Sequence, residues 1–449
     1  MNKALWAKGS SVNKAMQEFT VGNDPEIDLN FIKFDIIGSL AHAKMLNKID
    51  ILNNDELEKI TTELKKLLEV VKNEDYKIDR SFEDCHTAIE HELTQKIGDI
   101  GKKIHTGRSR NDQVLLAIRL YLRENISNVL TLLVDFNTSL LNKITELGDV
   151  PLPGYTHMQK AMPSSLGMWL HSFAEWALEL INEGTLLLDS INTSPLGAAS
   201  GFGVPLNLDR EYVAKLLGFK GSQRSVIHVQ NSRGRYELKA LRYLEDCFHL
   251  IEKFSIDFIL YNTQEFGFLN LPKSLTTGSS IMPQKHNPDI LELLRGNAAK
   301  VRGSANELQW VIAKLPSNYH RDFQYSKEPV VRAFNSTLQS LPMLITVTDS
   351  LTVNEEKLKN SMTDDLYATY DTYMRVRNGT PFREAYKETA NLISEDKLDV
   401  SQLKKDFKII EEKAKLEIKE CREEFLIINK KFVELGNLFS KCVKNLIDS

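Results

Sequence analysis

Apolar residues recur at steps of three and four positions along a segment that follows Asp112, contains no Gly or Pro, and ends near Leu147. The apolar positions are Leu115, Ile118, Leu122, Ile126, Val129, Leu133, Phe136, Leu140 and Ile144. This spacing averages about 3.6 residues and predicts one long amphipathic helix. Asn111 or Asp112 is the expected N-cap, and Gly148 followed by Pro151 is the expected stop. Such a helix is about 50 Å long, because each residue adds about 1.5 Å.

A helix of this length needs long neighbours to cover its apolar stripe. The same spacing predicts further helices over residues 164–191, 235–262, 288–313 and 328–351. Asn287 suits the N-cap of the third of these helices, and Pro288 suits its first position. Together these segments predict an elongated bundle of long helices.

The two ends of the chain differ from the middle. Residues 1–107 carry shorter helical segments with more breaks, and residues 356–449 are rich in Lys and Glu with short apolar repeats. We therefore expect smaller helical N- and C-terminal domains on either side of a central bundle domain, residues 108–355. No alternating strand pattern covers much of the chain, so the predicted fold class is all-α.

The composition is that of a soluble globular protein, with 42% hydrophobic and 26% charged residues. The net charge of −4 argues against a general nucleic-acid or membrane-surface binder. The sequence shows neither a long apolar span nor a secretory leader. The 4 cysteines show no metal-binding spacing and are interpreted as reduced thiols, so we expect a cytoplasmic protein without a metal site.

Four polar segments interrupt the helices with residue types that packing alone does not select. They span residues 102–113, 153–160, 276–289 and 316–327. The first precedes a helix N-terminus, which suits a carboxylate. The second holds a histidine beside a threonine, a pair that can move or orient a proton. The third is a long Gly/Ser/Thr-rich loop typical of a mobile lid, and the fourth combines Tyr, Gln and Lys side chains that can hold an anion.

Each segment by itself also fits a plainer interpretation: a capped polar loop, a structural histidine, a surface loop or a solvated turn. Their cations favour chemistry when taken together: Arg108, Arg110, Lys285, Arg321 and Lys327 all lie in these segments. A local cationic pocket in a net-acidic protein indicates a small polyanionic substrate such as a di- or tricarboxylate. The sequence contains no phosphate-binding, dinucleotide-binding or zinc-protease motif.

The four segments also carry a family resemblance. Residues 278–288, GSSIMPQKHNP, resemble the signature loop of the fumarase/aspartase superfamily, and we call them the signature loop. Gln284 within it, HTGRSRNDQ at 105–113 and GYTHMQ at 154–159 are similar to the argininosuccinate lyases of that superfamily. DCHTAIE at 84–90 and SPLG at 194–197 match the same family. The resemblance covers nearly the whole chain, in the same order of motifs.

The resemblance implies a reversible β-elimination that cleaves argininosuccinate to arginine and fumarate in arginine biosynthesis, without a metal or an organic cofactor. It implies a homotetramer with a twenty-helix core and active sites shared between three subunits. Ser279 is the implied base that removes a Cβ proton, which yields an aci-carboxylate intermediate. Backbone N–H groups and Lys285 then have to stabilise the serine alkoxide. Thr156 and His157 are implied to protonate the leaving nitrogen or to orient its donor, with Glu292 positioning His157.

The resemblance also implies a set of substrate-binding residues: Asp28, Ser109, Arg110, Asn111, Asn287, Tyr319, Gln324 and Lys327. Two positions depart from the family pattern. Asp24 stands where many members have a serine, which adds negative charge near an anionic substrate. Arg233-Gly234 stands where the family usually has Arg-Asp.

Two alternatives stay open. Another fumarate-releasing lyase of the superfamily would share the fold and the base. Fumarases generally have Gly in place of Gln284, and adenylosuccinate lyases usually have an aromatic residue there. An inactive, crystallin-like structural paralogue would share the fold alone, although Ser279 and His157 are both present.

Overall fold

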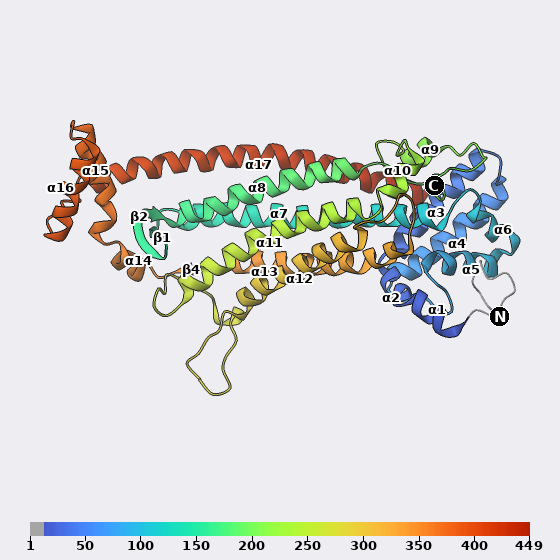
Figure 1. Ribbon diagram of the computed structural model, residues 1–449, viewed down its shortest axis with the longest axis horizontal. Coiled ribbons are helices and arrows are strands. Elements are labelled where there is room, and N and C mark those ends of the chain that lie inside the picture. Colours follow the sequence, from blue (N-terminus) through green and yellow to red (C-terminus); the bar gives the residue numbers. More distant parts are fainter. Residues whose placement is uncertain (1–12) are drawn as a thin grey trace.

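The computed structural model describes residues 13–449. Long helices lie side by side and form an elongated bundle (Figure 1). The bundle helices are α7 (Arg110–Leu147), α8 (Leu166–Ile191), α11 (Arg235–Asn262), α12 (Asp289–Ile312) and α13 (Lys327–Asp349). The predicted helices therefore exist, and the described part of the chain is mostly helical. The core between them is apolar and aromatic: the ring of Trp169 stacks on Phe254 with centroids 5.4 Å apart.

Helix α7 begins two or three residues earlier than expected, because its N-cap is Ser109 rather than Asn111 or Asp112. The Ser109 side chain accepts a hydrogen bond from the Asn111 backbone N–H, and the Asp112 carboxylate accepts one from the Ser109 backbone N–H. This reciprocal capping box uses a serine and an acidic residue three positions apart. Asp112 also accepts hydrogen bonds from the backbone N–H groups of Gly197 and Ala199, so it fastens a distant loop to this helix end.

The start of α12 corrects a second predicted cap. Helix α12 begins at Asp289, and Pro288 occupies the capping position. Asn287 is not available as the cap, because its backbone pairs with Thr277 across the base of the signature loop, with N···O distances of 2.8 and 3.1 Å. The loop is thereby closed at its base.

Shorter helices gather at one end of the bundle (Figure 1). They are α1 (Lys14–Val21), α2 (Asp24–Ile27), η1 (Asp28–Asn30), α3 (Ile32–Lys48), α4 (Asn54–Lys72), α5 (Cys85–Ile97), α6 (Asp99–Lys102), η2 (Lys103–His105), α9 (Arg210–Leu216) and α10 (Val226–Asn231). The turn η4 (Arg321–Ser326) precedes α13, and η3 (Lys273–Leu275) precedes the signature loop.

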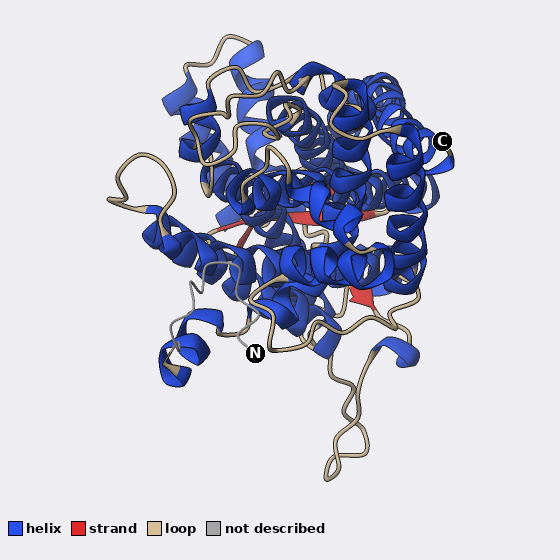
Figure 2. Ribbon diagram, turned by 90° about the vertical axis from the view of Figure 1, so that its right-hand side faces the viewer, coloured by secondary structure: helices blue, strands red, loops and turns tan. Residues whose placement is uncertain are grey.

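Four short strands are present that the helical pattern did not predict. β1 (Pro151–Thr156) and β2 (Gln159–Ser165) form an antiparallel hairpin beyond the end of α7, and β3 (Leu269–Asn270) pairs with β4 (Thr352–Val353). Figure 2 shows these strands as small pieces among helices. Pro151 and Pro153 end the helix as expected, and they also favour the extended backbone of β1.

The C-terminal part differs from the expected small cap. After α14 (Glu355–Ser361), η5 (Asp364–Tyr367), α15 (Ala368–Arg377) and α16 (Phe382–Ser394), the chain forms one helix of 46 residues, α17 (Leu403–Asp448). This helix runs back along the bundle to the N-terminal end (Figure 1). Its buried residues Phe425, Ile428, Phe432, Phe439 and Leu446 are spaced at helical intervals among Lys and Glu. Because Lys and Glu residues separate these apolar positions, the sequence pattern did not predict one continuous helix here.

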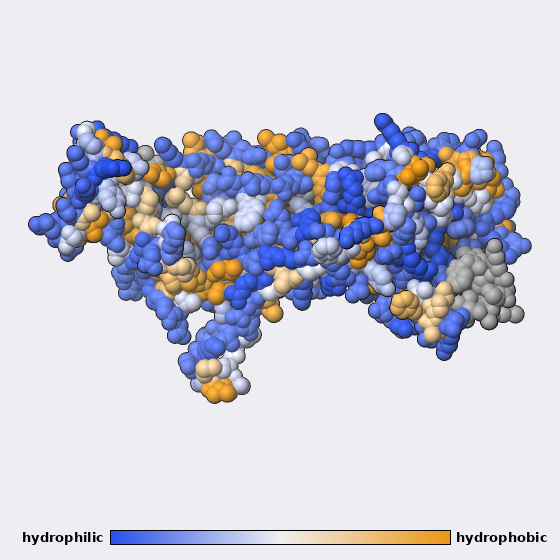
Figure 3. Space-filling view, viewed as in Figure 1, coloured by the Kyte–Doolittle hydropathy of each residue, from blue (hydrophilic) through white to orange (hydrophobic). Residues whose placement is uncertain are grey.

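The surface is mostly hydrophilic, but apolar atoms gather at the tip of the projecting signature loop (Figure 3). Ile281 and Met282 are exposed there. Leu293 and Trp310 on α12 are about 70% exposed as well, at 69% and 71%. No helix among residues 13–449 is long and apolar enough to cross a membrane.

Candidate functional site

A buried lysine lies between two aspartates at the N-terminal end of the bundle. Lys327 begins α13 and is only 4% exposed. Its Nζ lies 2.6 Å from Asp28 Oδ1 and 3.0 Å from Asp24 Oδ2. Asp28 Oδ2 also accepts a hydrogen bond from the Cys85 backbone N–H at 3.1 Å, at the start of α5. Three segments distant in sequence are therefore joined through the Lys327 ammonium and the Asp28 carboxylate.

The titration of this group follows from its burial. Burial raises the pKa of Asp24 to about 6; Lys327 lowers it, and the neighbouring carboxylate of Asp28 raises it. Burial acts to lower the pKa of Lys327, but the two carboxylates outweigh this effect and hold it above the ordinary value. The ammonium therefore stays charged at neutral pH. It neutralises only one of its two carboxylates, so the second is an excess negative charge.

Arg110 lies beside this group, at the first position of α7. Its guanidinium contacts the Glu83 carboxylate, lies 3.1 Å from Asp84 Oδ2 through Nε, and donates to Thr87 Oγ1 at 3.2 Å. Burial opposes the charge, but the acidic neighbours raise the pKa of Arg110. The predicted anion-binding arginine is thus oriented by acidic residues of its own chain. Glu83 was missed in the sequence, although it directly precedes the matched segment at 84–90.

The neighbours of Arg110 complete this end of the bundle. Ser109 and Asn111 are half-buried at the N-terminus of α7, where the positive end of the helix dipole favours an anion. Gln324 donates to the backbone carbonyls of Thr20 and Val21 at 3.0 and 3.2 Å. The guanidinium carbon of buried Arg233 lies 5.0 Å from the ring centroid of Tyr319.

Gly234 explains one departure from the family pattern. It directly precedes α11 with φ of +77°, a conformation that favours glycine. A Cβ atom at this position would lie 2.4 Å from Ile312 Cγ2. The local backbone is therefore built for glycine, and the aspartate usual in the family does not fit here without rearrangement.

The predicted Thr156–His157 pair lies elsewhere, at the tip of the β1–β2 hairpin. Thr156 pairs with Gln159, so His157 and Met158 form a two-residue turn, with φ values of +52° and +62°. Such turns favour Asn and Gly, and other residues store strain in them. His157 and Met158 are both exposed. The hairpin thus presents the histidine outward at a cost in backbone energy, which is typical of functional turns.

The third predicted group lies on the signature loop. Ser279 Oγ accepts hydrogen bonds from the backbone N–H groups of Met282 at 3.1 Å and Ile281 at 3.3 Å. Lys285 is exposed on the same loop, and Glu292 is exposed in the first turn of α12. The loop projects clear of the bundle in both ribbon views (Figures 1 and 2).

The three groups do not meet within one chain. Arg110 begins α7 and the hairpin with His157 follows its other end. Helix α7 has 38 residues, and at about 1.5 Å per residue it separates these ends by about 57 Å. One chain brings together Asp28, Ser109, Arg110, Asn111, Tyr319, Gln324 and Lys327 at one end, but it leaves Thr156, His157 and the signature-loop residues apart.

Among the described residues, one buried trio has metal-ligand chemistry: Asp35, Cys85 and His86, whose ligand atoms lie within 4.8 Å of one another. His86 Nδ1 is already hydrogen-bonded to Asp35 Oδ2 at 2.8 Å. Gln113 donates to the same carboxylate, and burial raises the pKa of the Cys85 thiol well above its usual range. The hydrogen bonds of this trio therefore fit a structural role for His86.

Comparison with known proteins identifies the family of this chain. Residues 8–303 match the model of a lyase family. The chain is 39% identical to the argininosuccinate lyase of Thermotoga neapolitana over 401 residues, which cover 88% of this chain and 100% of the relative. It is 41% identical to the argininosuccinate lyase of Xanthomonas oryzae pv. oryzae over 391 residues, 87% of this chain and 90% of the relative.

The chain belongs to the argininosuccinate lyase family. This family consists of carbon–nitrogen lyases. Solved structures support the fold: EDDS lyase in complex with formate has a TM-score of 0.78 at 20% identity, covering 98% of this chain and 97% of that one. Class II fumarase from Schistosoma mansoni has a TM-score of 0.72 at 15% identity, covering 87% and 93%. The chain therefore shares the fold of these two proteins.

Proposed function

We propose that this member of the argininosuccinate lyase family cleaves argininosuccinate reversibly to arginine and fumarate in arginine biosynthesis. The supporting observation from the structure is the environment of Ser279, whose Oγ receives two backbone N–H donors. A serine is a poor base unless its alkoxide is stabilised, and preorganised backbone donors supply that stabilisation. The proposed reaction uses no metal or organic cofactor and takes place in the cytoplasm.

In the proposed mechanism the Ser279 alkoxide removes the Cβ proton next to a carboxylate. The C–H electrons enter that carboxylate, which becomes a dianionic aci-carboxylate. Lys285 stabilises this charge as the loop closes and excludes water. The electrons then return, the C–N bond breaks, and fumarate forms. The leaving guanidinium nitrogen takes a proton from His157 or from a donor that Thr156 and His157 orient.

The charged end of the bundle binds the substrate in this proposal. An ammonium group has three N–H donors. Asp28 and Asp24 occupy two donors of Lys327, which leaves one for the carboxylate of the arginine moiety. Tyr319 and Gln324 flank that moiety. On the succinyl side, the donors are Ser109, Arg110, Asn111 and Asn287, and Glu292 positions His157.

The proposed assembly is a homotetramer with a twenty-helix core, in which three subunits share each active site. The separation of the three groups along α7 supports the proposal that different chains supply them. An exposed stripe on α12 supports such packing: Leu293, Gly296, Gly303 and Trp310 lie along one side at intervals of three and seven residues. A Cβ atom at Gly296 or Gly303 would meet nothing within 4 Å, so a partner helix has room to approach.

The first experiment follows fumarate formation by ultraviolet absorbance with argininosuccinate, aspartate, malate and adenylosuccinate in parallel. We expect turnover of argininosuccinate alone. Turnover of another of these substrates would retain the fold and the base but overturn the proposed specificity. If none of them reacts, the active-enzyme proposal itself fails.

A mixing experiment tests the shared site. His157→Ala and Lys327→Met chains are each expected to be inactive alone. When they are unfolded together and refolded as mixed assemblies, about a quarter of the sites receive both groups from intact segments, since the two segments come from different chains of the oligomer. Recovery of activity supports the shared site. Absence of recovery, with mixed assemblies verified by mass spectrometry, contradicts it.

A further inference from the structure

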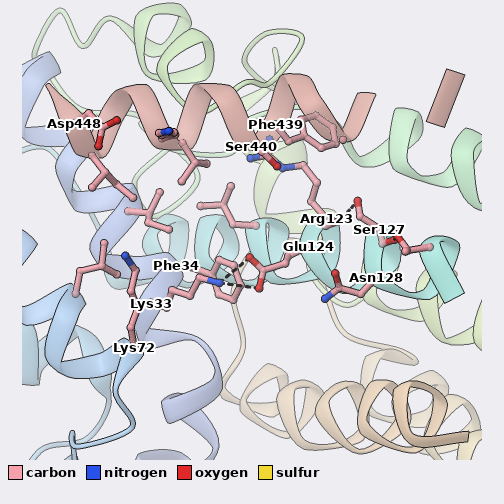
Figure 4. A pocket seen from close by; sticks show the side chains of 18 of the residues that line it. Lys33, Phe34, Lys72, Arg123, Glu124, Ser127, Asn128, Phe439, Ser440 and Asp448 are labelled. Carbon is pink, nitrogen blue, oxygen red and sulfur yellow. Dashed lines mark hydrogen bonds and ion pairs between the residues drawn. The ribbon is translucent and has the colours of Figure 1, made fainter. Parts of the chain in front are cut away.

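A cavity of about 560 Å³ lies away from all the predicted site residues, between α17 and the helices α3, α4 and α7 (Figure 4). Volumes of this size are typical of small-molecule sites. One wall is apolar, with Phe34, Ile37, Leu68, Phe432 and Val443 among its residues. The cavity is therefore large enough and apolar enough to hold the hydrocarbon part of a ligand.

The polar feature of this cavity is a buried arginine. Arg123 extends from α7 toward Phe439 and Ser440 on α17 (Figure 4) and is only 4% exposed. Its guanidinium lies between two rings, 4.2 Å from the centroid of Phe439 and 4.7 Å from that of Phe219. Its Nη1 atom has no hydrogen-bond partner among residues 13–449. A buried, charged N–H group without a hydrogen-bond acceptor is costly, and an anion that reaches Nη1 removes that cost.

Within the described part of the chain, no carboxylate forms an ion pair with Arg123. Glu124, the next residue, turns to Lys33 instead, with an N···O distance of 2.7 Å, as the dashed lines in Figure 4 show. Burial lowers the pKa of Arg123 to about 10, so the guanidinium still carries its charge at neutral pH. The cavity lining holds four cationic side chains and two anionic ones, namely Lys33, Lys72, Arg123, Lys444, Glu124 and Asp448. This balance favours a ligand with negative charge.

A glycine in α17 leaves the space open. Gly436 lies in the interior of a 46-residue helix, where glycine costs about 1 kcal/mol relative to alanine. It lines the cavity, and a Cβ atom built there would meet nothing within 4 Å. Gly436 shares this face of α17 with Phe432, Phe439 and Val443. Gly436 therefore lowers the stability of the helix at a position where any side chain would enter the cavity.

We propose that this cavity is a binding site for a small amphipathic carboxylate, whose anionic head pairs with Arg123 and whose apolar body lies along Phe34, Phe432 and Val443. The site is separate from the proposed catalytic residues and does not depend on the proposed reaction. It contacts α3 and α7, and the latter carries Ser109 and Arg110 at its N-terminal end.

The test uses three probes with the same ten-carbon chain: decanoate, decanol and decylammonium, each below its aggregation limit. Calorimetric titration of the full chain is expected to show saturable decanoate binding, with decanol and decylammonium at least about tenfold weaker, since hydrogen bonds to charged groups carry most of the discrimination. Equal affinity for all three probes, or no saturable binding of decanoate, overturns the proposal.

Two variants locate the site. Arg123→Met is expected to weaken decanoate binding about tenfold and to leave decanol unchanged, while Arg123→Lys retains part of the affinity because it retains the charge. Gly436→Leu fills the cavity, so it is expected to abolish binding and to raise the thermal midpoint without ligand. Gly436→Leu also keeps the test valid if Arg123→Met fails to fold. Unchanged decanoate affinity in folded Gly436→Leu protein places binding elsewhere and contradicts the proposal. Glu434→Gln, on the exposed face of α17, is the matched control and should bind decanoate like the wild type.

Discussion

The excess carboxylate beside Lys327 gives a sharp prediction for Asp24→Asn. The ammonium is 4% exposed and is held by Asp28 at 2.6 Å and Asp24 at 3.0 Å. With all three groups ionised, the cluster carries one net negative charge in a buried place. Asparagine at position 24 keeps an oxygen acceptor for Lys327 and removes that charge. We therefore expect the variant to be more stable than the wild type at neutral pH.

The magnitude follows from the titration of Asp24. Its pKa is raised from 3.8 to about 6 in the folded protein. A shift of about two units corresponds to about 3 kcal/mol at about 1.4 kcal/mol per unit. Because the folded-state pKa is raised, the folded protein binds more protons than the unfolded chain between about pH 4 and pH 6. This group's contribution to stability is full below pH 4 and is lost as the pH rises through 6.

The assay compares urea unfolding of wild type and Asp24→Asn from pH 4 to pH 7.5 at one protein concentration. The two free energies of unfolding should converge near pH 4. The variant should gain up to about 3 kcal/mol over the wild type by pH 7.5. Asp75→Asn, which removes an exposed aspartate outside the site, is the matched control and should follow the wild type at every pH.

Two results would refute this reasoning. A difference between wild type and Asp24→Asn that does not change with pH would show that Asp24 does not titrate differently in the folded state. A variant less stable than the wild type at pH 7.5 would show that Lys327 needs both carboxylates, and that the Coulomb attraction outweighs the burial of the excess charge.

Three further predictions concern the site and its supports. Ser279→Ala should lower the rate of fumarate formation about a thousandfold or more, as the loss of other catalytic groups that act directly on the reacting bond does. Size-exclusion chromatography should show an unchanged assembly, and near-wild-type turnover would exclude Ser279 as the base. Ser109→Ala should lower the free energy of unfolding by about 1 kcal/mol through loss of the α7 cap, whereas Ser109→Asn keeps the cap. Urea unfolding and fumarate assays of both variants separate capping from substrate contact, because a binding role predicts lost activity in both. Gly234→Asp should lower the free energy of unfolding by about 1–3 kcal/mol because of the positive φ and the clash with Ile312. If urea unfolds the variant and the wild type at the same midpoint, the backbone at this position adapts to a side chain.

Much of the helical architecture could be predicted from the sequence alone. The extent of α11 and the end of α7 are encoded locally, because apolar period, caps and breakers act over a few residues. The expected α7 cap was two or three residues late, since a capping box is decided by which side chain reaches back to the backbone. The apolar stripe of α17 was missed, because long Lys and Glu side chains surround it and only packing on α8 and the N-terminal helices shows which face is buried.

For the candidate site too, some features could be predicted from the sequence and others could not. The sequence determined which residue types stand in the polar segments, and their order matched one family. Tertiary structure decided that Lys327 meets Asp24 and Asp28 from a segment about 300 positions away, because such contacts depend on how helices pack and not on local spacing. It also decided that Gly234 has room for no side chain, and that His157 and Arg110 stand at opposite ends of α7. A helix about 57 Å long separates them rigidly, so the proposal that different chains complete the site rests on this geometry and not on any motif.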